Sequence, residues 1–347
     1  MRYKVGVWGQ FGDGGKIADG QAVRTTIITN ELECKYGKDQ VFRANTNNWK
    51  KHPFRFLKNT LRLFFKSDNV VVLPADNGFK VIVPIYYFLN SIFKRNLLYI
   101  VIGGFLPKLL ENQRRFVKML KCYKSIYVQT ENIKNDLELL GLNNIKFITN
   151  LKRINSVSKD ELKENEGELV TFVIMSRITE DKGILDSINA VNIANEKLGD
   201  KKIRLDIYGM IPDNFKSTFE AAVEENSDVV TYRGVADYNK TVEALKPYFA
   251  MLFATYFHGE GFPGCFIDAF NSGLPIIATD WLYNKDLIKD GYNGLLVPIK
   301  DPESLSNAIL KLYYDRNLTY RLALNSLDKA KDYDPEIVLK DFYSDLV

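Results

Sequence analysis

A glutamate set between two glycines opens residues 258–280, which read HGEGFPGCFIDAFNSGLPIIATD. The glycines on either side of Glu260 leave room for a ligand beside its carboxylate. Pro263 then suits the first turn of a helix, where a missing N–H breaks no helical hydrogen bond. Asp268 follows about one turn inside that helix, at the end that we expect to face a ligand. The stretch therefore predicts a ligand site that includes the Glu260 carboxylate.

The start of the same helix is suited to an anion. The first N–H groups of a helix have no partner within it and lie at the positive end of its dipole. Three such groups would point to the strand ends: those of Gly264, Cys265 and Phe266. A structural alternative makes Asp268 only a favourable acid at the helix start, but it leaves Glu260 unexplained.

Two cations follow the first strand of the second half, in the stretch SRITEDKG. Arg177 and Lys182 lie on either side of a turn before a helix, so a planar guanidinium and a point-charge ammonium could clamp a diphosphate. The alternative is an ordinary solvated, charged turn.

A glycine-rich loop, GQFGDGGK, follows the first strand of the chain. Gly14 and Gly15 would let backbone N–H groups approach a phosphate or a sugar, or would only form a tight turn. The loop matches neither G-x-G-x-x-G nor a Walker loop.

The elements that carry these loops alternate between strand and helix. The strands predicted in the first half are 3–9, 41–46, 69–75, 96–104, 125–130 and 145–150. Those predicted in the second half are 169–177, 204–209, 229–234, 249–255, 275–280 and 294–298. This alternation predicts an α/β fold with two parallel, doubly wound, Rossmann-like sheets, whose ligands bind outside the carboxyl ends of the strands.

The polar stretch 151–167 reads as a linker between two domains. We predict an N-terminal Rossmann-like domain at 1–155 and a C-terminal Rossmann-like domain at 156–330. The remaining residues, 331–347, are expected to form a helix that packs back toward the N-terminal domain. The length of 347 residues suits two domains with sizeable cores.

Charge is divided unevenly between the halves. Residues 1–150 carry 24 Lys and Arg against 11 Asp and Glu, a net charge of +13, whereas residues 151–347 carry a net charge of −9. A basic half suits anionic lipid, a phosphorylated substrate or nucleic acid. It contains no recognised nucleic-acid motif, so we expect no nucleic-acid partner.

The three cysteines, Cys34, Cys122 and Cys265, are odd in number and widely spaced, which predicts neither disulfides nor a zinc site and favours a reducing compartment. The most apolar run, VIVPIYYFLNSIF at 81–93, is too short to span a bilayer. The N-terminus lacks the features of a signal peptide. We therefore expect a cytoplasmic protein. The D-x-D at 332–334 fits helix capping before a proline, so no metal is predicted.

These motifs together resemble the retaining family-four glycosyltransferases, also called glycosyl transferases group 1. Their signature of two glutamates separated by seven residues stands here as EGFPGCFIDA, from Glu260 to Asp268. Four further motifs match in order over about 130 residues: SRITEDKG, LDIYG at 205–209, SGLPIIAT at 272–279 and DGYNGLLVP at 290–298. The first half is similar more loosely, through the glycine loop, IADGQAV at 17–23 and VIGGFLP at 101–107.

The resemblance implies a GT-B architecture, in which an acceptor-side domain at 1–155 and a nucleotide-sugar-binding domain at 156–330 face each other across a cleft. It also implies a retaining hexosyltransferase that needs neither metal nor cofactor. It implies a nucleoside diphosphate sugar as donor, with UDP-sugars favoured over GDP-mannose, and a role in polysaccharide assembly such as that of capsule or lipopolysaccharide. Glu260 would hold sugar hydroxyls, while Arg177 and Lys182 would stabilise charge on the leaving diphosphate. The implied donor-binding residues are Gly14, Gly15, Gly209, Arg233, Gly261, Phe262, Pro263, Gly264, Cys265, Phe266 and Asp268.

The chain departs from the family pattern at the second acid of the signature. Asp268 replaces the usual glutamate, which is expected to bind the ribose hydroxyls, so its shorter side chain would reach them less directly. Asp286 likewise stands where many members have glutamate. His258 is placed to act as a base beside Glu260, but we interpret it as a loop residue that shapes the sugar pocket.

The stretch 49–67, WKKHPFRFLKNTLRLFFKS, interleaves cations with aromatics. Five apolar residues can share one helical face: Phe54, Leu57, Leu61, Phe64 and Phe65. With the basic stretch 112–124, its cations form the predicted acceptor or membrane face: Lys50, Lys51, Arg55, Lys58, Arg62, Arg114 and Arg115. Such a helix could lie on anionic lipid or hold a lipid diphosphate, or it could simply pack on the sheet. We expect peripheral association with the cytoplasmic membrane face and a lipid-linked acceptor.

Two other classes of function compete with this prediction. A catalytically inactive GT-B module that binds a partner transferase is favoured only by the replacement at Asp268. A dinucleotide-dependent oxidoreductase would need G-x-G-x-x-G followed by an acidic residue at the next strand end, and the chain lacks this pattern.

Overall fold

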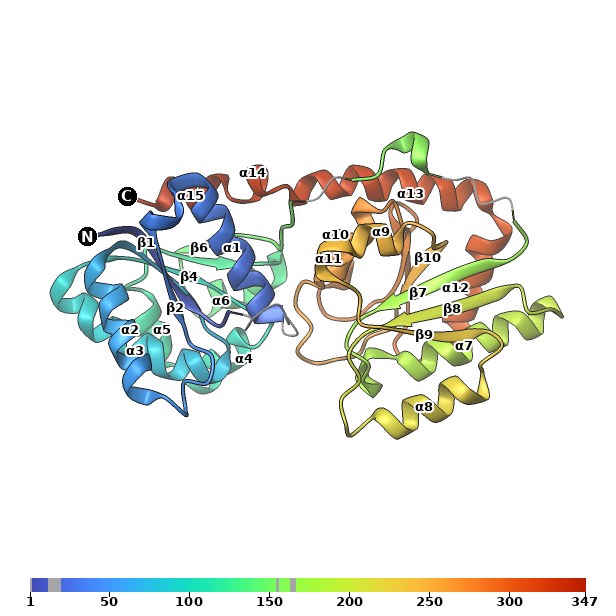
Figure 1. Cartoon of the computed structure of the whole chain (residues 1–347), viewed down its shortest axis with the longest axis horizontal. Coiled ribbons are helices and arrows are strands. Elements are labelled where there is room, and N and C mark those ends of the chain that lie inside the picture. The colour runs from blue at the N-terminus through green and yellow to red at the C-terminus, as the bar shows by residue number, and fades with distance from the viewer. Residues whose placement is uncertain (1, 12–19, 154–155, 163–166) are drawn as a thin grey trace. The chain divides into compact units, whose positions relative to one another are not determined.

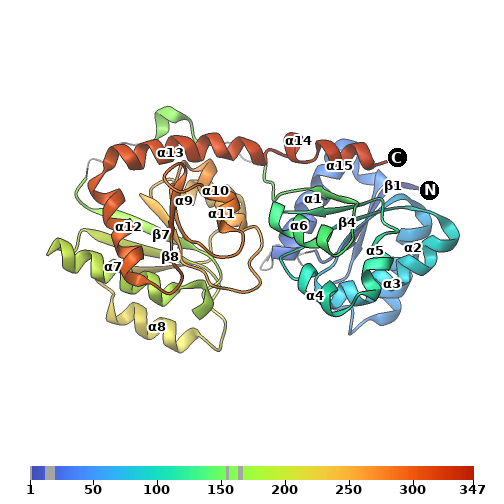
Figure 2. The same cartoon turned by 180° about the vertical axis from the view of Figure 1, so that it is seen from behind.

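The computed structural model describes residues 2–11, 20–153, 156–162 and 167–347. The chain divides into two compact units (Figures 1 and 2). Unit 1 comprises Met1–Lys152 and Asp334–Val347, and unit 2 comprises Arg153–Tyr333. The divisions predicted from the sequence, at 155/156 and 330/331, lie a few residues from these boundaries. The C-terminal residues are therefore part of the same unit as the N-terminus.

Unit 1 contains a six-stranded parallel sheet in the order β2-β1-β3-β4-β5-β6. Its strands are β1 (Tyr3–Gly9), β2 (Val41–Asn45), β3 (Ser67–Leu73), β4 (Asn96–Ile100), β5 (Ser125–Val128) and β6 (Ile145–Phe147). Its helices are α1 (Gly20–Tyr36), α2 (Pro53–Lys66), α3 (Asp76–Phe93), α4 (Leu106–Asn112), α5 (Arg115–Leu120), α6 (Glu131–Leu139), α14 (Pro335–Val338) and α15 (Lys340–Asp345).

Unit 2 contains a second six-stranded parallel sheet in the order β12-β11-β10-β7-β8-β9. Its strands are β7 (Val170–Met175), β8 (Ile203–Tyr208), β9 (Val230–Gly234), β10 (Ala250–Phe253), β11 (Ile276–Thr279) and β12 (Gly294–Val297). Its helices are α7 (Ile184–Leu198), α8 (Lys216–Glu225), α9 (Thr241–Leu245), α10 (Gly264–Asn271), α11 (Asn284–Leu287), α12 (Pro302–Tyr314) and α13 (Arg316–Ala330). The predicted fold class is confirmed, with a strand at each of the twelve predicted positions.

The strands read as apolar runs because each sheet is covered on both faces. In β10, Ala250 and Leu252 join one core cluster, which also contains residues of α7 and α12. Met251 and Phe253 join another cluster, which contains residues of α10. All four side chains are buried. A parallel sheet buried on both faces lacks the alternation of polar and apolar residues seen in half-exposed strands.

The strand order of unit 2 places a topological switch point between β7 and β10. β8 and β9 are added within the sheet on one side of β7. The chain then returns, and β10, β11 and β12 are added on the other side of β7. The loops after β7 and β10 therefore leave the sheet in opposite directions. Ligands of doubly wound sheets bind at this point, outside the carboxyl ends of the strands.

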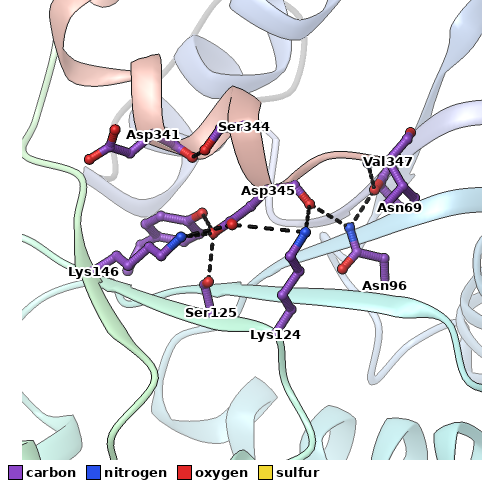
Figure 3. Close-up of polar contacts among 10 residues, drawn as sticks. Asn69, Asn96, Lys124, Ser125, Lys146, Asp341, Ser344, Asp345 and Val347 are labelled. Atoms are coloured by element: carbon purple, nitrogen blue, oxygen red, sulfur yellow. Dashed lines mark hydrogen bonds and ion pairs between the residues drawn. The ribbon is translucent and has the colours of Figure 1, made fainter.

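The C-terminal tail is fixed to unit 1 at the amino ends of its strands (Figure 3). The buried carboxylate of Asp345 accepts hydrogen bonds from Ser125 Oγ at 2.6 Å and from Lys146 Nζ at 2.8 Å. Its main-chain oxygen accepts from Asn96 Nδ2 at 2.8 Å. Val347 exchanges two hydrogen bonds with the side chain of Asn69. Residues from β3, β4, β5 and β6 thus hold one short segment.

Candidate functional site

Lys182 and Glu260 meet at the switch point of unit 2. Lys182 ends a short 3-10 turn, Glu180–Lys182, between β7 and α7, and Glu260 lies in the loop between β10 and α10. Their side chains form an ion pair, and each is only about one-tenth exposed: 10% for the lysine and 9% for the glutamate. The two residues that the sequence places in separate motifs are therefore in direct contact.

The surroundings of this ion pair are partly aromatic and partly polar. The Lys182 ammonium lies 5.5 Å from the centre of the Phe253 ring and 5.0 Å from that of Phe257, within reach of cation–π attraction. The Thr255 hydroxyl donates to Glu260 Oε2 at 3.0 Å. Among the described residues, no donor binds the second oxygen, Oε1. The pair is thus oriented by its neighbours while one carboxylate oxygen stays available to a ligand hydroxyl.

The backbone around the pair requires glycine at position 183. Gly183 has φ of +67°, and a Cβ built there would lie 2.1 Å from the carbonyl oxygen of Ala254, just after β10. The main-chain N–H of Tyr256 donates to the oxygen of Asp181 at 2.8 Å, and the Thr279 hydroxyl donates to the oxygen of Thr255 at 2.5 Å. These contacts join the loops after β7, β10 and β11 at one edge of the sheet.

Arg177 lies in the loop after β7 and is exposed. Its guanidinium makes no hydrogen bond or ion pair with any described residue. The structure therefore places it at the predicted edge of the sheet without bringing it into contact with Lys182 or Glu260. An exposed guanidinium at this edge can bind an anionic ligand through its planar array of donors.

The start of α10 offers two backbone donors, one fewer than predicted. The Phe266 N–H donates to the Pro263 oxygen at 3.1 Å, so the prediction of a third free group was wrong. The N–H groups of Gly264 and Cys265 have no partner among the described residues, and a Cβ added to Gly264 would meet nothing within 4 Å. The helix start thus stays suited to an anion.

Three neighbouring side chains belong to the protein interior or are inert. Phe262 is 6% exposed and packs against Tyr333, and Phe266 is 0% exposed and packs against Phe253. Only the backbones of these two residues could therefore contact a nucleotide-sugar donor. Burial raises the pKa of the Cys265 thiol, and the negative charge of Glu260 raises it further. The thiol therefore stays protonated and is a poor nucleophile.

Asp268 lies about one turn inside α10, as predicted, and is buried. Its carboxylate is 6% exposed and accepts a hydrogen bond from the Thr241 hydroxyl at 2.8 Å. Burial raises the pKa of Tyr238, and the charge of Asp268 contributes to this rise. The acid therefore contacts the start of α9 and lies near Tyr238, just before that helix, a relationship that no local sequence signal predicted.

Gly209 and Arg233 have structural partners at the same edge of the sheet. A Cβ on Gly209 would lie 1.8 Å from the Ser176 oxygen, so glycine there permits two backbones to approach. Arg233 Nε donates to Asp206 Oδ2 at 2.7 Å, and Tyr248 Oη donates to the same oxygen at 2.7 Å. These two hydrogen bonds compensate the negative charge of Asp206, which is buried on β8.

The predicted acceptor or membrane face lies on unit 1 and is exposed at each of its cations: Lys50, Lys51, Arg55, Lys58, Arg62, Arg114 and Arg115. The predicted apolar face of α2 is only partly correct. Phe64 is fully buried in unit 1, whereas Phe54, Leu57 and Phe65 are 88%, 45% and 39% exposed. The helix therefore packs on the sheet through one apolar stripe and presents a second one outward.

Some predictions fall outside the described residues or concern bound groups. Gly14 and Gly15 lie in the part of the chain that the structure does not describe. Within the described residues, three or more His, Cys, Asp or Glu side chains nowhere gather as they would around a metal ion. None of the described helices is both long enough and apolar enough to cross a membrane.

Sequence comparison relates the chain to known transferases. It is 24% identical over 276 residues to an uncharacterised glycosyltransferase of Methanocaldococcus jannaschii, covering 76% of this chain and 65% of that protein. It is 24% identical over 210 residues to the poly(glycerol-phosphate) alpha-glucosyltransferase of Bacillus subtilis, covering 60% of this chain and 30% of that protein. The chain thus spans less than two thirds of the length of these curated relatives.

Structural comparison bears on the fold. A crystal structure of HepE from Anabaena in complex with UDP superimposes with a TM-score of 0.75 at 16% identity, over 99% of both chains. The two-sheet architecture is the GT-B fold that the sequence motifs imply. The family model of glycosyl transferases group 1 matches residues 155–328, which is half of the chain and includes both members of the Lys182–Glu260 pair. The chain belongs to the glycosyl transferases group 1 family.

Proposed function

We propose that the chain is a retaining hexosyltransferase that moves a sugar from a nucleoside diphosphate donor, a UDP-sugar, to a lipid-linked glycan in polysaccharide assembly. The observation that carries this proposal is the Lys182–Glu260 ion pair at the switch point of unit 2, next in sequence to the open start of α10. A UDP donor is supported by the UDP complex of the Anabaena protein, and a polymeric acceptor by the name of the Bacillus relative.

The chemical difficulty in such a transfer is the departure of the diphosphate. Negative charge grows on its oxygen as the bond to the sugar lengthens. The Lys182 ammonium, the exposed Arg177 and the N–H groups of Gly264 and Cys265 can stabilise that charge, and donors placed in this way supply a large share of catalysis. The proposal that no metal takes part rests on this donor set.

Glu260 would orient the sugar rather than attack it. Its Oε2 is bound by Lys182 and Thr255, which lowers its reactivity as a nucleophile. Its Oε1 can accept a hydrogen bond from a sugar hydroxyl. In the proposed retaining mechanism the acceptor hydroxyl attacks on the face from which the diphosphate leaves, and the diphosphate takes the proton.

The donor should be identified before the mechanism is tested. Thermal shift with a panel of UDP- and GDP-sugars gives the ligand that raises the melting temperature most. Turnover of that donor, radiolabelled in its sugar, should then fall by at least ~100-fold in Glu260→Gln and by ~10-fold or more in Arg177→Ala. Arg204→Ala is a matched control, because Arg204 is equally exposed but lies near the amino end of β8.

Normal turnover in Glu260→Gln would disprove the assignment. A different outcome would support an accessory GT-B module. In that case the wild-type chain alone neither hydrolyses nor transfers any donor tested, and activity requires a partner protein. The replacement of the usual glutamate by Asp268 is the feature that favours this second possibility.

Unit 1 supports the proposed association with an anionic membrane. The outward apolar residues of α2 continue onto α3, where Phe88, Ile92 and Phe93 are 65%, 60% and 46% exposed. The rings of Phe65 and Phe93 are 5.0 Å apart, which joins the two helices. Exposed cations flank this surface: Lys51, Arg55, Lys58, Arg62, Lys66 and Lys94. Exposed apolar side chains and cations on or next to the same two helices suit the cytoplasmic surface of a bilayer.

Vesicles of phosphatidylglycerol and phosphatidylcholine test this association. Binding should require the anionic lipid and weaken between about 50 and 500 mM salt, because screening shortens the range of the attraction. The double variant Arg55→Glu/Lys58→Glu should lose binding, whereas Lys216→Glu/Lys311→Glu, with the same change of net charge on unit 2, should keep it. Binding that is indifferent to salt and to both pairs would rule out an electrostatic contact.

A further inference from the structure

A tryptophan just beyond the end of β11 lies against the loop that carries Glu260. β11 ends at Thr279, and Asp280 lies between that residue and Trp281. The three residues form a tight turn, in which the Trp281 N–H donates to the Thr279 oxygen at 2.8 Å. The Asn284 N–H in turn donates to the Trp281 oxygen at 3.0 Å, and Asn284 Nδ2 donates to the Thr279 oxygen at 3.0 Å. The backbone on both sides of Trp281 is thereby fixed.

The indole N–H of Trp281 and the main-chain N–H of Glu260 share one acceptor. Trp281 Nε1 donates to the Phe257 oxygen at 2.9 Å, and the Glu260 N–H donates to the same oxygen at 3.1 Å. The second of these bonds closes the turn 257–260. Trp281 therefore holds the carbonyl on which the turn of Glu260 is built.

The same turn, 257–260, includes Phe257, whose ring contacts the ammonium of the Lys182–Glu260 ion pair. The Phe257 ring lies 5.0 Å from the Lys182 ammonium, and the Phe257 N–H donates to Thr255 Oγ1 at 3.2 Å. The ring of His258 packs edge-on against Trp281, with the ring centres 5.3 Å apart. A movement of Phe257 would therefore move both the ring beside Lys182 and the carboxylate of Glu260.

We propose that Trp281 is a positioning residue for Glu260, acting through the Phe257 carbonyl; this inference rests on the proposed function. The loop needs such support because Gly259 and Gly261 flank Glu260, and glycine gives a chain more conformational freedom than any other residue. A hydrogen-bond donor held by the turn after β11 reduces that freedom. A displacement of about 1 Å at a reacting group can lower a rate by ~100-fold.

Trp281→Phe separates positioning from packing. Phenylalanine keeps an aromatic ring against His258 but lacks the indole N–H. We expect kcat with the donor identified by thermal shift to fall by ~10- to 100-fold, while the KM of the donor changes by less than about threefold, because the carboxylate is misplaced and the diphosphate contacts remain.

Trp8→Phe is the matched control. The Trp8 indole N–H donates to Thr60 Oγ1 at 3.0 Å in the buried part of unit 1, so this variant also loses a tryptophan hydrogen bond. It should lower the melting temperature at least as much as Trp281→Phe and leave kcat unchanged. Equal losses of kcat in both variants would mean that Trp281 acts only through general stability, and would overturn the inference.

A double-mutant cycle with Glu260→Gln completes the test. If Trp281 acts through Glu260, Trp281→Phe should cause less than a twofold further loss of kcat in the Glu260→Gln background. The full loss in that background would contradict the inference. If Glu260→Gln alone keeps normal turnover, the proposed function fails; if it loses turnover but Trp281→Phe does not, only the role of Trp281 fails.

Discussion

Lys182 and Glu260 are 78 residues apart in the sequence and form a buried ion pair at the carboxyl edge of the second sheet. Neither residue is tied to the other by any local pattern. They meet because the chain leaves β7 in one direction and returns through β10 beside it. A buried pair of this kind is sensitive to the loss of one partner, because the remaining charge is left without compensation.

We therefore expect Lys182→Met to destabilise the chain more than Lys182→Met/Glu260→Gln does. The single variant leaves the carboxylate buried and unpaired, which should lower the free energy of unfolding by about 3 kcal/mol. The double variant removes both charges and should recover at least half of that loss. Urea unfolding of the three proteins measures the difference; equal losses would show that solvent compensates the lone carboxylate.

Gly183→Ala should destabilise the chain more than Gly199→Ala, although both glycines have almost the same φ, +67° and +68°. A left-handed residue other than glycine costs roughly 1–2 kcal/mol at either position. At Gly183 the new Cβ must also displace the Ala254 carbonyl, whereas nothing lies within 4 Å at Gly199. We expect a loss of about 3 kcal/mol against about 1 kcal/mol, measured by urea unfolding, and a fall in turnover at Gly183 alone.

Thr241→Val should weaken binding of the nucleotide by ~10-fold, while Thr241→Ser should bind nearly as well as the wild type. Asp268 stands at the position expected to bind the ribose hydroxyls of the nucleotide, and the Thr241 hydroxyl donates to its carboxylate. A hydrogen bond to a charged group contributes roughly 1.5–3 kcal/mol. Valine has the same shape as threonine without the donor. Calorimetry with UDP measures the affinity, and equal affinities for valine and serine would show that Asp268 needs no such partner.

The stability that Asp345 contributes should depend on pH. Burial would raise the pKa of this carboxyl, but the hydrogen bonds from Lys146, Ser125 and Tyr127 outweigh burial and hold it below its usual value. A carboxyl whose pKa is lower in the folded state stabilises the fold above its unfolded pKa, about 3.9, and this contribution is lost as pH falls through the folded-state pKa.

Asp345→Asn should accordingly lower the free energy of unfolding by about 2 kcal/mol at pH 7, with the gap to the wild type closing below about pH 4. Asp341→Asn is the control from the same tail, since Asp341 is exposed and its carboxylate makes none of the contacts drawn around Asp345 in Figure 3. Urea titrations at several pH values decide the point. A gap that stays constant down to pH 3 would mean that the charge of Asp345 does not carry the stabilisation.

The positions of the strands and of the main acidic and basic residues could be read from the sequence. Apolar runs, glycines and prolines report on local conformation, because each acts within a few residues of itself. They predict the strand before Arg177, the helix start at Pro263 and the loop that carries Glu260, and all three are found in the structure. The family motifs predict the chemical role of these residues, because each motif requires particular residue types at the end of a particular strand.

The partners of those residues required the tertiary structure. Hydrogen bonds such as Thr241 to Asp268, Arg233 to Asp206 and Trp281 to Phe257 join separate segments of the chain, and their distances depend on strand order and register. Phe64 illustrates the same limit: periodicity places it on the apolar side of α2 but does not say which apolar residues the sheet covers. Local patterns choose the elements, whereas packing between elements chooses which side chains meet.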